Sequence, residues 1–353
     1  AEETVAHVFA EVLEMDRVGA FDNFFEVGGN SLTAAAAVAR VADATECALS
    51  VRDLFGNPTV AGFAACVGRA RRRVRPTLTP IARDGLLPLA PAQHRMWLIN
   101  RVDPESAAYN IPLVLRLTGR LDPAALRTAL GDVLDRHEAL RTRYPARDGH
   151  GMQEVLSAEA ALADFDCVPE QLGQDRLAGR IRELTAAGFD VCARPPLRAD
   201  LLTIGPDTHV LVLVLHHICC DGTSLAPLAA DFAAAYAARS QATAPDQVPP
   251  RVQYADYADW HRRLLGDEAD PDSLAADQLR YWTTQLADAP AVLELPTDRP
   301  RPARRSMRGE AVTTQLSART YTEIERLARA ADVTPFMVVH AALAVLLARL
   351  SGT

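Results

Sequence analysis

Two short motifs contain side chains with chemical reactivity. The first reads Asp22-x-Phe24-Phe25-x-x-Gly28-Gly29-Asn30-Ser31-Leu32, with two phenylalanines, two glycines and then a serine. Glycine permits a tight backbone turn, and a serine at a helix start lies beside free N–H groups that favour a phosphate. A serine in this place can also be a plain helix cap. The motif therefore predicts either a phosphate attachment point at Ser31 or an ordinary N-cap.

The second motif is His216-His217-Ile218-Cys219-Cys220-Asp221-Gly222, whose two histidines end a near-continuous β-branched and leucine run over residues 208–217. Successive strand residues face opposite sides, so one histidine faces any given cavity and the other is packed and hydrogen-bonded. A neutral imidazole is suited to proton transfer near pH 7. A packed core pair and a metal site are the other interpretations. The metal interpretation lacks a third ligand at useful spacing.

Composition excludes several kinds of chemistry. The chain has 353 residues, which allows two or three domains, and its net charge is −8. All 37 basic residues are arginine, so Schiff-base, pyridoxal-lysine and P-loop-lysine chemistry are excluded. The six cysteines are irregularly spaced, which predicts neither a zinc site nor a disulfide framework. No apolar stretch is long enough to span a bilayer and no signal peptide opens the chain, so we expect a soluble cytoplasmic protein without membrane contact.

The acidic charge is concentrated in residues 1–68, which contain ten carboxylates and three arginines, a net charge of −7. A small acidic module followed by a nearly neutral region argues against nucleic acid as a partner. A run of arginines at positions 69, 71, 72, 73 and 75 is interpreted as part of a solvated linker.

Hydrophobic periodicity predicts four helices and no strand in residues 1–68, then a linker over 69–86 that is rich in arginine and proline. Residues 87–353 read as a mixture of helices and strands. The expected strands are 111–117 and 208–217, the second buried on both faces; the expected helices are 122–139, one from Gly222 to about Tyr236, 254–265, 273–287 and 334–350.

Residues 1–68 resemble the peptidyl carrier domains of nonribosomal peptide synthetases, which are all-α four-helix bundles. The resemblance is carried by the acidic helical module and by the motif around Gly28-Gly29-Asn30-Ser31. It implies that Ser31 carries a 4′-phosphopantetheine arm holding an aminoacyl or peptidyl thioester. It also implies an upstream adenylation domain and a phosphopantetheinyl transferase as partners. The family often has His or Asp where this chain has Asn30, so that position gives no hint about the next domain.

Residues 87–353 resemble a condensation domain of the same synthetases, an α/β acyltransferase fold similar to chloramphenicol acetyltransferase. Ala90 and Met96 depart from the usual first motif, and a full domain is longer, so we expect the N-terminal lobe and the start of a truncated C-terminal lobe. The motifs that carry the resemblance occur in order at 90–97 (APAQHRMW), 136–144 (RHEALRTRY), 216–224 (HHICCDGTS), 254–260 (YADYADW), 281–282 (YW) and 295–300 (LPTDRP).

The resemblance implies a role for each residue of the histidine motif. His217 faces a central tunnel, where it accepts a proton from the acceptor amine or orients that amine. Gly222 offers a backbone N–H to a developing oxyanion, and a side chain there would obstruct the tunnel. His216 is packed, and Asp221 is structural, with Arg299 as a candidate ion-pair partner. No metal is expected.

Two further groups of side chains are interpreted as structural. Tyr254 and Trp260 are expected to be core contacts and not substrate contacts. The remaining group is a basic cluster around the end of the helix predicted at 122–139: Arg136, His137, Arg141 and Arg143.

The order of the domains predicts the reaction. A carrier directly before a condensation domain delivers the donor, so the thioester on Ser31 would be attacked by the amine of an acceptor held on a downstream carrier, forming a peptide bond. The 18-residue linker over 69–86 leaves no room for an epimerisation domain, which favours an L-configured or achiral donor. Two alternatives remain open: the second domain is itself an epimerisation domain, or it is a non-catalytic docking platform.

Overall fold

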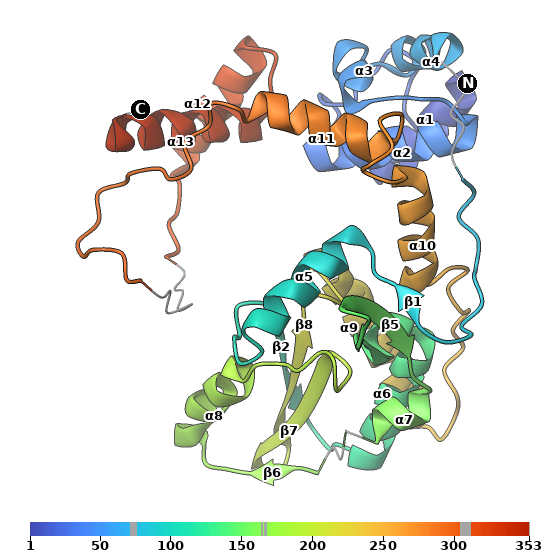
Figure 1. Cartoon of the computed structure of the whole chain (residues 1–353), viewed down its shortest axis with the longest axis vertical. Helices are drawn as coiled ribbons and strands as arrows, with labels where there is room; N and C mark the ends of the chain where they lie inside the picture. The colour runs from blue at the N-terminus through green and yellow to red at the C-terminus, as the bar shows by residue number, and fades with distance from the viewer. Residues whose placement is uncertain (71–75, 164, 166–167, 304–311, 353) are drawn as a thin grey trace. The chain divides into compact units, whose positions relative to one another are not determined.

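The computed structural model describes residues 1–70, 76–163, 165, 168–303 and 312–352 (Figure 1). Contacts between Cα atoms divide the chain into two compact units. The first contains Ala1–Arg75, Asp288–Pro302 and Glu310–Thr353, and the second contains Pro76–Ala287 and Ala303–Gly309. Of the arginine run, only Arg69 lies within the described residues. The predicted boundaries at residues 68 and 87 stay a prediction.

Four helices form the N-terminal part of the first unit. Their core is apolar and includes three phenylalanines, of which Phe9 lies against Phe24 with ring centroids 4.7 Å apart and against Phe63 at 6.0 Å. The four-helix prediction is confirmed, although the first helix is shorter than the pattern suggests. The helices are α1 (Glu2–Val12), α2 (Ser31–Thr45), α3 (Val51–Gly56) and α4 (Val60–Arg69).

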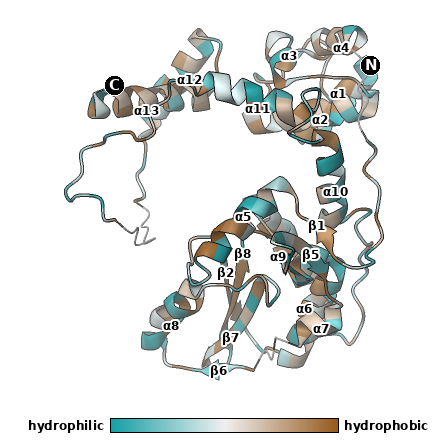
Figure 2. Cartoon of the chain, viewed as in Figure 1, coloured by the Kyte–Doolittle hydropathy of each residue, from teal (hydrophilic) through white to brown (hydrophobic). Residues whose placement is uncertain are grey.

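The same unit contains two later helices, α12 (Ala318–Ala330) and α13 (Pro335–Ser351). Apolar residues extend along most of α13 (Figure 2), and several, including Phe336 and Val345, are exposed. Among the described residues no single helix is long and apolar enough to cross a membrane. The α12 and α13 pair meets the length and composition criteria only when the two are combined, and they are bent by 102°.

A four-stranded sheet organises the second unit, in the order β2-β8-β7-β6. Strand β8 (Thr208–His216) pairs antiparallel with β2 (Asn110–Thr118) on one side and with β7 (Leu197–Gly205) on the other. The short edge strand β6 (Glu170–Gln171) pairs parallel with β7. In the register, Asn110 lies opposite His216, so β2 begins beside the end of β8 that carries the histidine motif.

Helices cover both faces of this sheet. Alternate residues of β8 pack on α6 (Pro123–Arg136) and α9 (Leu225–Arg239), and the residues between them pack toward α5 (Pro91–Val102) and α8 (Gln174–Ala186). From His209 to His216 every residue of β8 is buried, which confirms the prediction of a strand covered on both faces.

Helix α6 begins as the sequence predicts, since the Asp122 side chain accepts from two backbone N–H groups and Pro123 follows. It ends at Arg136 and not at 139, because the chain tightens into a 3₁₀ turn there. The other elements of the second unit are η1 (Glu138–Arg141), β1 (Leu87–Pro88), β3 (Thr142–Arg143), β4 (Ala146–Arg147), β5 (His150–Val155), α7 (Ala158–Leu162), η2 (Gly222–Ser224), α10 (Tyr254–Leu265) and α11 (Leu274–Gln285).

Candidate functional site

The histidine motif is held where β8 leaves the sheet. The backbone N–H of His216 donates to the carbonyl of Pro196 at 2.9 Å, and that of His217 donates to the carbonyl of Tyr109 at 2.8 Å. The motif is therefore anchored to both neighbouring chain segments. Sequence reasoning missed Tyr109, whose only signal is its place directly before the strand that pairs with β8.

His216 is a packed residue with 2% of its surface exposed. Its ring lies 5.9 Å from the ring of Phe189 and 6.1 Å from that of Tyr109, measured between centroids. Its Nδ1 accepts a hydrogen bond from the Ile218 N–H at 3.1 Å, which the neutral ring provides. Burial, with a smaller contribution from the charge of His217, lowers the pKa of His216 to about 4. His216 is therefore neutral at pH 7.

His217 points out of the core and is exposed. Its Nδ1 lies 2.8 Å from the backbone carbonyl oxygen of Cys220. A carbonyl oxygen only accepts, so Nδ1 carries the proton and donates it. In the neutral ring Nε2 then holds the free lone pair. The loop thus presents one basic nitrogen at an exposed position.

The Asp221 side chain forms its hydrogen bonds within its own turn. Its Oδ1 accepts from the backbone N–H of Ser224 at 2.9 Å and from the hydroxyls of Thr223 and Ser224, each at 2.7 Å. These hydrogen bonds lower the pKa of Asp221 below its usual value. The carboxylate therefore caps η2. Arg299 belongs to the other compact unit, so its pairing with Asp221 stays a prediction.

Gly222 opens the η2 turn directly after Asp221. A Cβ atom at this position would meet no atom of the described residues within 4 Å. Within the described part of the chain no contact therefore requires a glycine here, and the space beside it is open.

A cavity of about 240 Å³ adjoins the motif. Its walls are mostly apolar, with two thiols, one hydroxyl and one imidazole. It is lined by His137, Ala139, Leu140, Cys219, Cys220, Ser224, Pro227 and Leu228.

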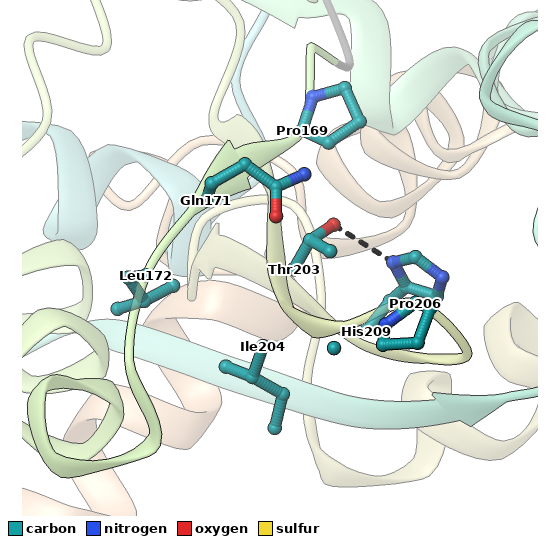
Figure 3. Close-up of a pocket in the computed structure, with 8 residues that line it drawn as sticks. Pro169, Gln171, Leu172, Thr203, Ile204, Pro206 and His209 are labelled. Atoms are coloured by element: carbon teal, nitrogen blue, oxygen red, sulfur yellow. Dashed lines mark hydrogen bonds between the residues drawn. The ribbon is translucent and has the colours of Figure 1, made fainter.

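A larger and more open cavity of about 610 Å³ lies at the turn between β7 and β8 (Figure 3). There the hydroxyl of Thr203 lies 2.8 Å from Nδ1 of His209. His209 and His216 are at opposite ends of β8, roughly 23 Å apart at the usual rise of a strand. The larger cavity is thus remote from the histidine motif, and we assign the site to the motif on chemical grounds.

The basic cluster at the end of α6 is structural, in agreement with the sequence interpretation. Asp231 on α9 accepts from Arg136 at 2.8 Å and lies 2.7 Å from Nε2 of His137. Arg141 donates to the carbonyls of Leu134 and Leu156, and Arg143 pairs with Glu154.

The interpretation of Tyr254 as a core contact was wrong, because 37% of its surface is exposed. Tyr254 is the first residue of α10, so it lies at the N-terminal end of the helix, where one side of the residue is open to solvent. Trp260, further along α10, is half-buried and donates its indole N–H to the carbonyl of Pro76 at 2.5 Å.

Ser31 is the first residue of α2, and its motif forms a fixed turn. Gly28 has a φ of +114°, which favours glycine. A Cβ on Gly29 would overlap the ring and the carbonyl of Phe24. The cap of α2 is Asn30, whose Oδ1 accepts from the N–H groups of Leu32 at 2.9 Å and Thr33 at 3.1 Å. The helix therefore does not depend on Ser31 as its N-cap.

The surroundings of Ser31 suit an attached phosphate. No acidic residue occurs in the first turn of α2, so the helix dipole is not opposed there. The neighbouring Leu32 is 84% exposed, which places the helix start at the surface. Among the described residues no group of three His, Cys, Asp or Glu side chains is arranged to hold a metal ion.

Comparison with known families identifies both parts of the chain. Residues 83–353 match the family model described as "Condensation domain", and residues 3–67 match "Phosphopantetheine attachment site". The chain belongs to the condensation-domain family, and a carrier domain for 4′-phosphopantetheine precedes the condensation domain. This confirms the predicted classes of both domains.

Curated relatives are nonribosomal peptide synthetases. The chain is 46% identical over 351 residues to a probable non-canonical nonribosomal peptide synthetase of Salinispora arenicola, covering 99% of this chain and 4% of that protein. It is 42% identical over 351 residues to a dimodular nonribosomal peptide synthase of Bacillus subtilis, covering 99% of this chain and 15% of that protein. The chain thus spans a small part of these relatives.

Solved structures agree with the fold. The X-domain from teicoplanin biosynthesis superposes with a TM-score of 0.72 at 36% identity, covering 78% of this chain and 60% of that one. The first condensation domain of the calcium-dependent antibiotic synthetase gives a TM-score of 0.54 at 25% identity, covering 77% of this chain and 63% of that one.

Proposed function

We propose that this chain takes part in nonribosomal peptide synthesis as a donor carrier followed by a peptide-bond-forming acyltransferase. The acyl group is carried as a thioester at Ser31 and would be transferred to the amine of an aminoacyl thioester on a downstream carrier. A C–N bond would form as the C–S bond of the donor thioester breaks, and the thiol on Ser31 would be freed. The observation that carries the proposal is the Nδ1–H of His217 donating to the Cys220 carbonyl, which leaves Nε2 basic at an exposed position.

His217 is the catalytic residue in this proposal. Its Nε2 accepts a hydrogen bond from the attacking amine and takes up the proton that the amine loses as the C–N bond forms. The Cys220 carbonyl stabilises the ring while it is positively charged, because Nδ1–H continues to donate. His216, with its pKa near 4, adds no second positive charge beside it at pH 7.

Gly222 supplies space and a backbone donor. Its N–H lies at the start of the η2 turn, where it is suited to stabilise negative charge on the carbonyl oxygen under attack. The open region around its Cα accommodates the thioester. Asp221 keeps the turn in place by capping it.

Ser31 is the attachment residue for 4′-phosphopantetheine. The capped helix start, the absence of an acidic residue in its first turn and the exposed surface beside it fit the phosphate. When bound, the group supplies a flexible thiol on which the acyl group is activated as a thioester. The upstream adenylation domain and the phosphopantetheinyl transferase are the partners that this assignment requires.

Attachment is tested by incubating the protein with coenzyme A and a phosphopantetheinyl transferase and measuring its intact mass. We expect a single addition on the peptide that contains Ser31, and none in Ser31→Ala. The matched control is Ser50→Ala, because Ser50 also lies at a helix start in the same module, where it caps α3. An addition to Ser31→Ala would contradict the assignment.

Transfer is tested in the complete synthetase with its downstream carrier. We expect His217→Ala to reduce peptide formation about a hundredfold or more. His94→Ala is the control, since His94 is an exposed histidine on α5 of the same unit. Equal peptide formation in both variants would exclude His217 as the base.

A non-catalytic docking platform is the second candidate. It is favoured by the resemblance to the teicoplanin X-domain, which was also solved in complex with OxyB. In that case His217→Ala would leave both product formation and the binding of any partner unchanged. An epimerisation domain would be recognised by a D-configured donor in the product.

A further inference from the structure

A cavity beside the histidine motif has no role in the reaction described above. Its volume is about 240 Å³, and two of its lining residues, Cys220 and Ser224, lie on either side of Gly222 in the chain. We propose that this cavity is the binding pocket for the side chain of the donor residue, and that it selects an apolar side chain up to the size of a benzyl group. This role rests on the proposed function, because the side chain belongs to the acyl group that is transferred.

The position of the cavity favours the donor over the acceptor. In the proposed function the carbonyl oxygen of the donor lies at the N–H of Gly222, and the Cα atom of the donor is one bond from that carbonyl carbon. Gly222 and Ser224 belong to the same three-residue turn, η2, and Ser224 lines the cavity. The acceptor amine lies instead at Nε2 of His217, which is not among the lining residues. The side chain nearest to the cavity is therefore that of the donor.

The cavity leads from the surface toward the core of the second unit. Pro227 in its lining is exposed, whereas Leu140 and Leu228 are buried and belong to the hydrophobic core that contains residues of α6 and α9. A side chain that enters beside η2 therefore meets apolar surface at the inner end. A cavity of about 150 Å³ with aliphatic walls is large enough to bind benzene. A cavity of about 240 Å³ thus accommodates a phenyl ring together with its methylene group.

Three polar side chains of the lining already form hydrogen bonds within the fold. The hydroxyl of Ser224 donates to Oδ1 of Asp221 at 2.7 Å, and the thiol of Cys219 donates to a backbone carbonyl. Nε2 of His137 donates to the carboxylate of Asp231 at 2.7 Å. Among the described residues no arginine and no carboxylate lines the cavity. A charged donor side chain would therefore lose its water without gaining an ionic partner, whereas burial of an apolar side chain is favourable.

The wall that η1 contributes is held in place from both ends. Gln253 of α10 accepts the backbone N–H of Glu138 at 3.2 Å and donates to the carbonyl of Arg136 at 2.9 Å. The hydroxyl of Thr142 donates to the carbonyl of Glu138 at 2.7 Å. Ala139 lies between these anchored positions and lines the cavity. Because the turn is anchored, we expect a larger side chain at Ala139 to occupy the pocket and not to displace the turn.

The first test measures binding to the whole chain and does not depend on activity. The probe is an amide analogue of phenylalanyl pantetheine, in which nitrogen replaces the thioester sulfur so that the acyl group cannot be transferred. We expect nuclear Overhauser effects between its ring protons and the methyl groups of Leu140 and Leu228. Ala139→Leu should abolish them, whereas Ala230→Leu, at an exposed position on α9 of the same unit, should retain them. No contact with either leucine up to the solubility limit of the probe would overturn the proposal.

The second test compares donors in the complete synthetase. Each donor is loaded at Ser31 directly from its aminoacyl-coenzyme A, so that adenylation does not select it. We expect peptide formation to be faster with leucyl than with aspartyl donor, which has a similar shape, and faster with phenylalanyl than with alanyl donor, by about tenfold or more in each case. Equal rates with all four donors would overturn the selectivity.

Ala139→Leu should lower the rate with phenylalanyl donor about tenfold or more and leave the rate with alanyl donor unchanged, while Ala230→Leu changes neither. An equal loss with both donors in Ala139→Leu would show a structural effect and overturn the pocket. If Ala139→Leu does not fold, Cys220→Ala takes its place. It widens the pocket, so the rate with tryptophanyl donor should rise relative to that with phenylalanyl donor, and an unchanged ratio would overturn the proposal.

The two tests distinguish failure of the pocket from failure of the proposed function. If the probe contacts Leu140 and Leu228 while the unchanged synthetase makes no peptide from any donor, the proposed function fails and the apolar binding pocket stands. If peptide forms without preference among the donors and the probe does not contact these leucines, the proposed function stands and the pocket fails.

Discussion

The guanidinium of Arg83 lies 2.7 Å from the carboxylate of Asp256, although 173 residues separate them in the chain. Asp256 is 1% exposed and also accepts the backbone N–H of Ile81 at 2.9 Å. Arg83 reaches Glu138 of η1 as well, at 2.8 Å. Residues 76–86 of the predicted linker are therefore held against α10 by these hydrogen bonds, and they belong to the second compact unit.

Loss of this buried pair should destabilise the second unit strongly. In Asp256→Ala the guanidinium loses a buried partner, which costs about 3–5 kcal/mol in the free energy of unfolding. Asp259→Ala is the control, because Asp259 pairs with Arg263 on the surface of the same helix; such a pair contributes about 0.3–0.5 kcal/mol. Denaturant unfolding of the two variants measures the difference, and equal losses would show that the Arg83 contact is unimportant.

His216 should make the stability of the second unit dependent on pH. Its pKa is about 4 in the folded protein against an ordinary value of 6.5, so between these values the unfolded chain binds a proton that the folded protein does not. The free energy of unfolding therefore falls as the pH falls through this window, by on the order of 3 kcal/mol for this group. Denaturant unfolding at about pH 7 and about pH 5 tests this.

The matched comparison for that experiment is His216→Gln against His94→Gln. We expect His216→Gln to flatten the pH dependence, because the group that becomes protonated on unfolding is gone. His94→Gln should retain the dependence of the parent. A parent protein whose stability does not fall below pH 6.5 would contradict the low pKa of His216.

A methyl group at Gly29 should disrupt the turn before Ser31. The added Cβ of Gly29→Ala overlaps the ring and carbonyl of Phe24, a clash that costs about 1–3 kcal/mol. Gly56→Ala in the same module meets nothing within 4 Å and should be neutral. Thermal unfolding and the rate of phosphopantetheine addition measure both effects, and a normal rate in Gly29→Ala would show that the turn is not needed.

Gly222→Val should lower peptide formation without changing the stability of the fold. The position is open, so we expect the melting temperature to change little. If the thioester occupies this space, peptide formation falls at least tenfold, because the valine side chain fills it. Full activity in Gly222→Val would show that the thioester does not bind beside Gly222. Failure of this variant to fold would show that another structural constraint acts at this position.

The sequence was most informative where a pattern had one physical solution. The near-continuous β-branched and leucine run over 208–217 required a strand covered on both faces, and Asp122-Pro123 required a helix start. The serine motif was assigned through its resemblance to a family, since its residue types alone also fitted a plain cap. The capping residue proved to be Asn30.

Other features depended on contacts between distant segments and gave no local signal. Strand β7 was not predicted, because Arg198 and Asp200 interrupt its apolar residues. The Arg198 guanidinium is accommodated by backbone carbonyls, including that of Gly188 at 2.6 Å. The contact of Tyr109 with His217 and that of Arg83 with Asp256 likewise arise only from the fold.

Because side chains alternate along a strand, the position of each histidine in the count along β8 determines which of the two is exposed to solvent. The residues of β8 alternate between two buried layers, and the count from the hairpin at Thr208 leads to a packed His216 and an outward His217. Deleting one residue between His209 and His216 would exchange the layers for all that follows. The number of residues in β8 therefore sets the orientation of His217. A change of one residue would misplace this proposed base even though every residue of the motif remained.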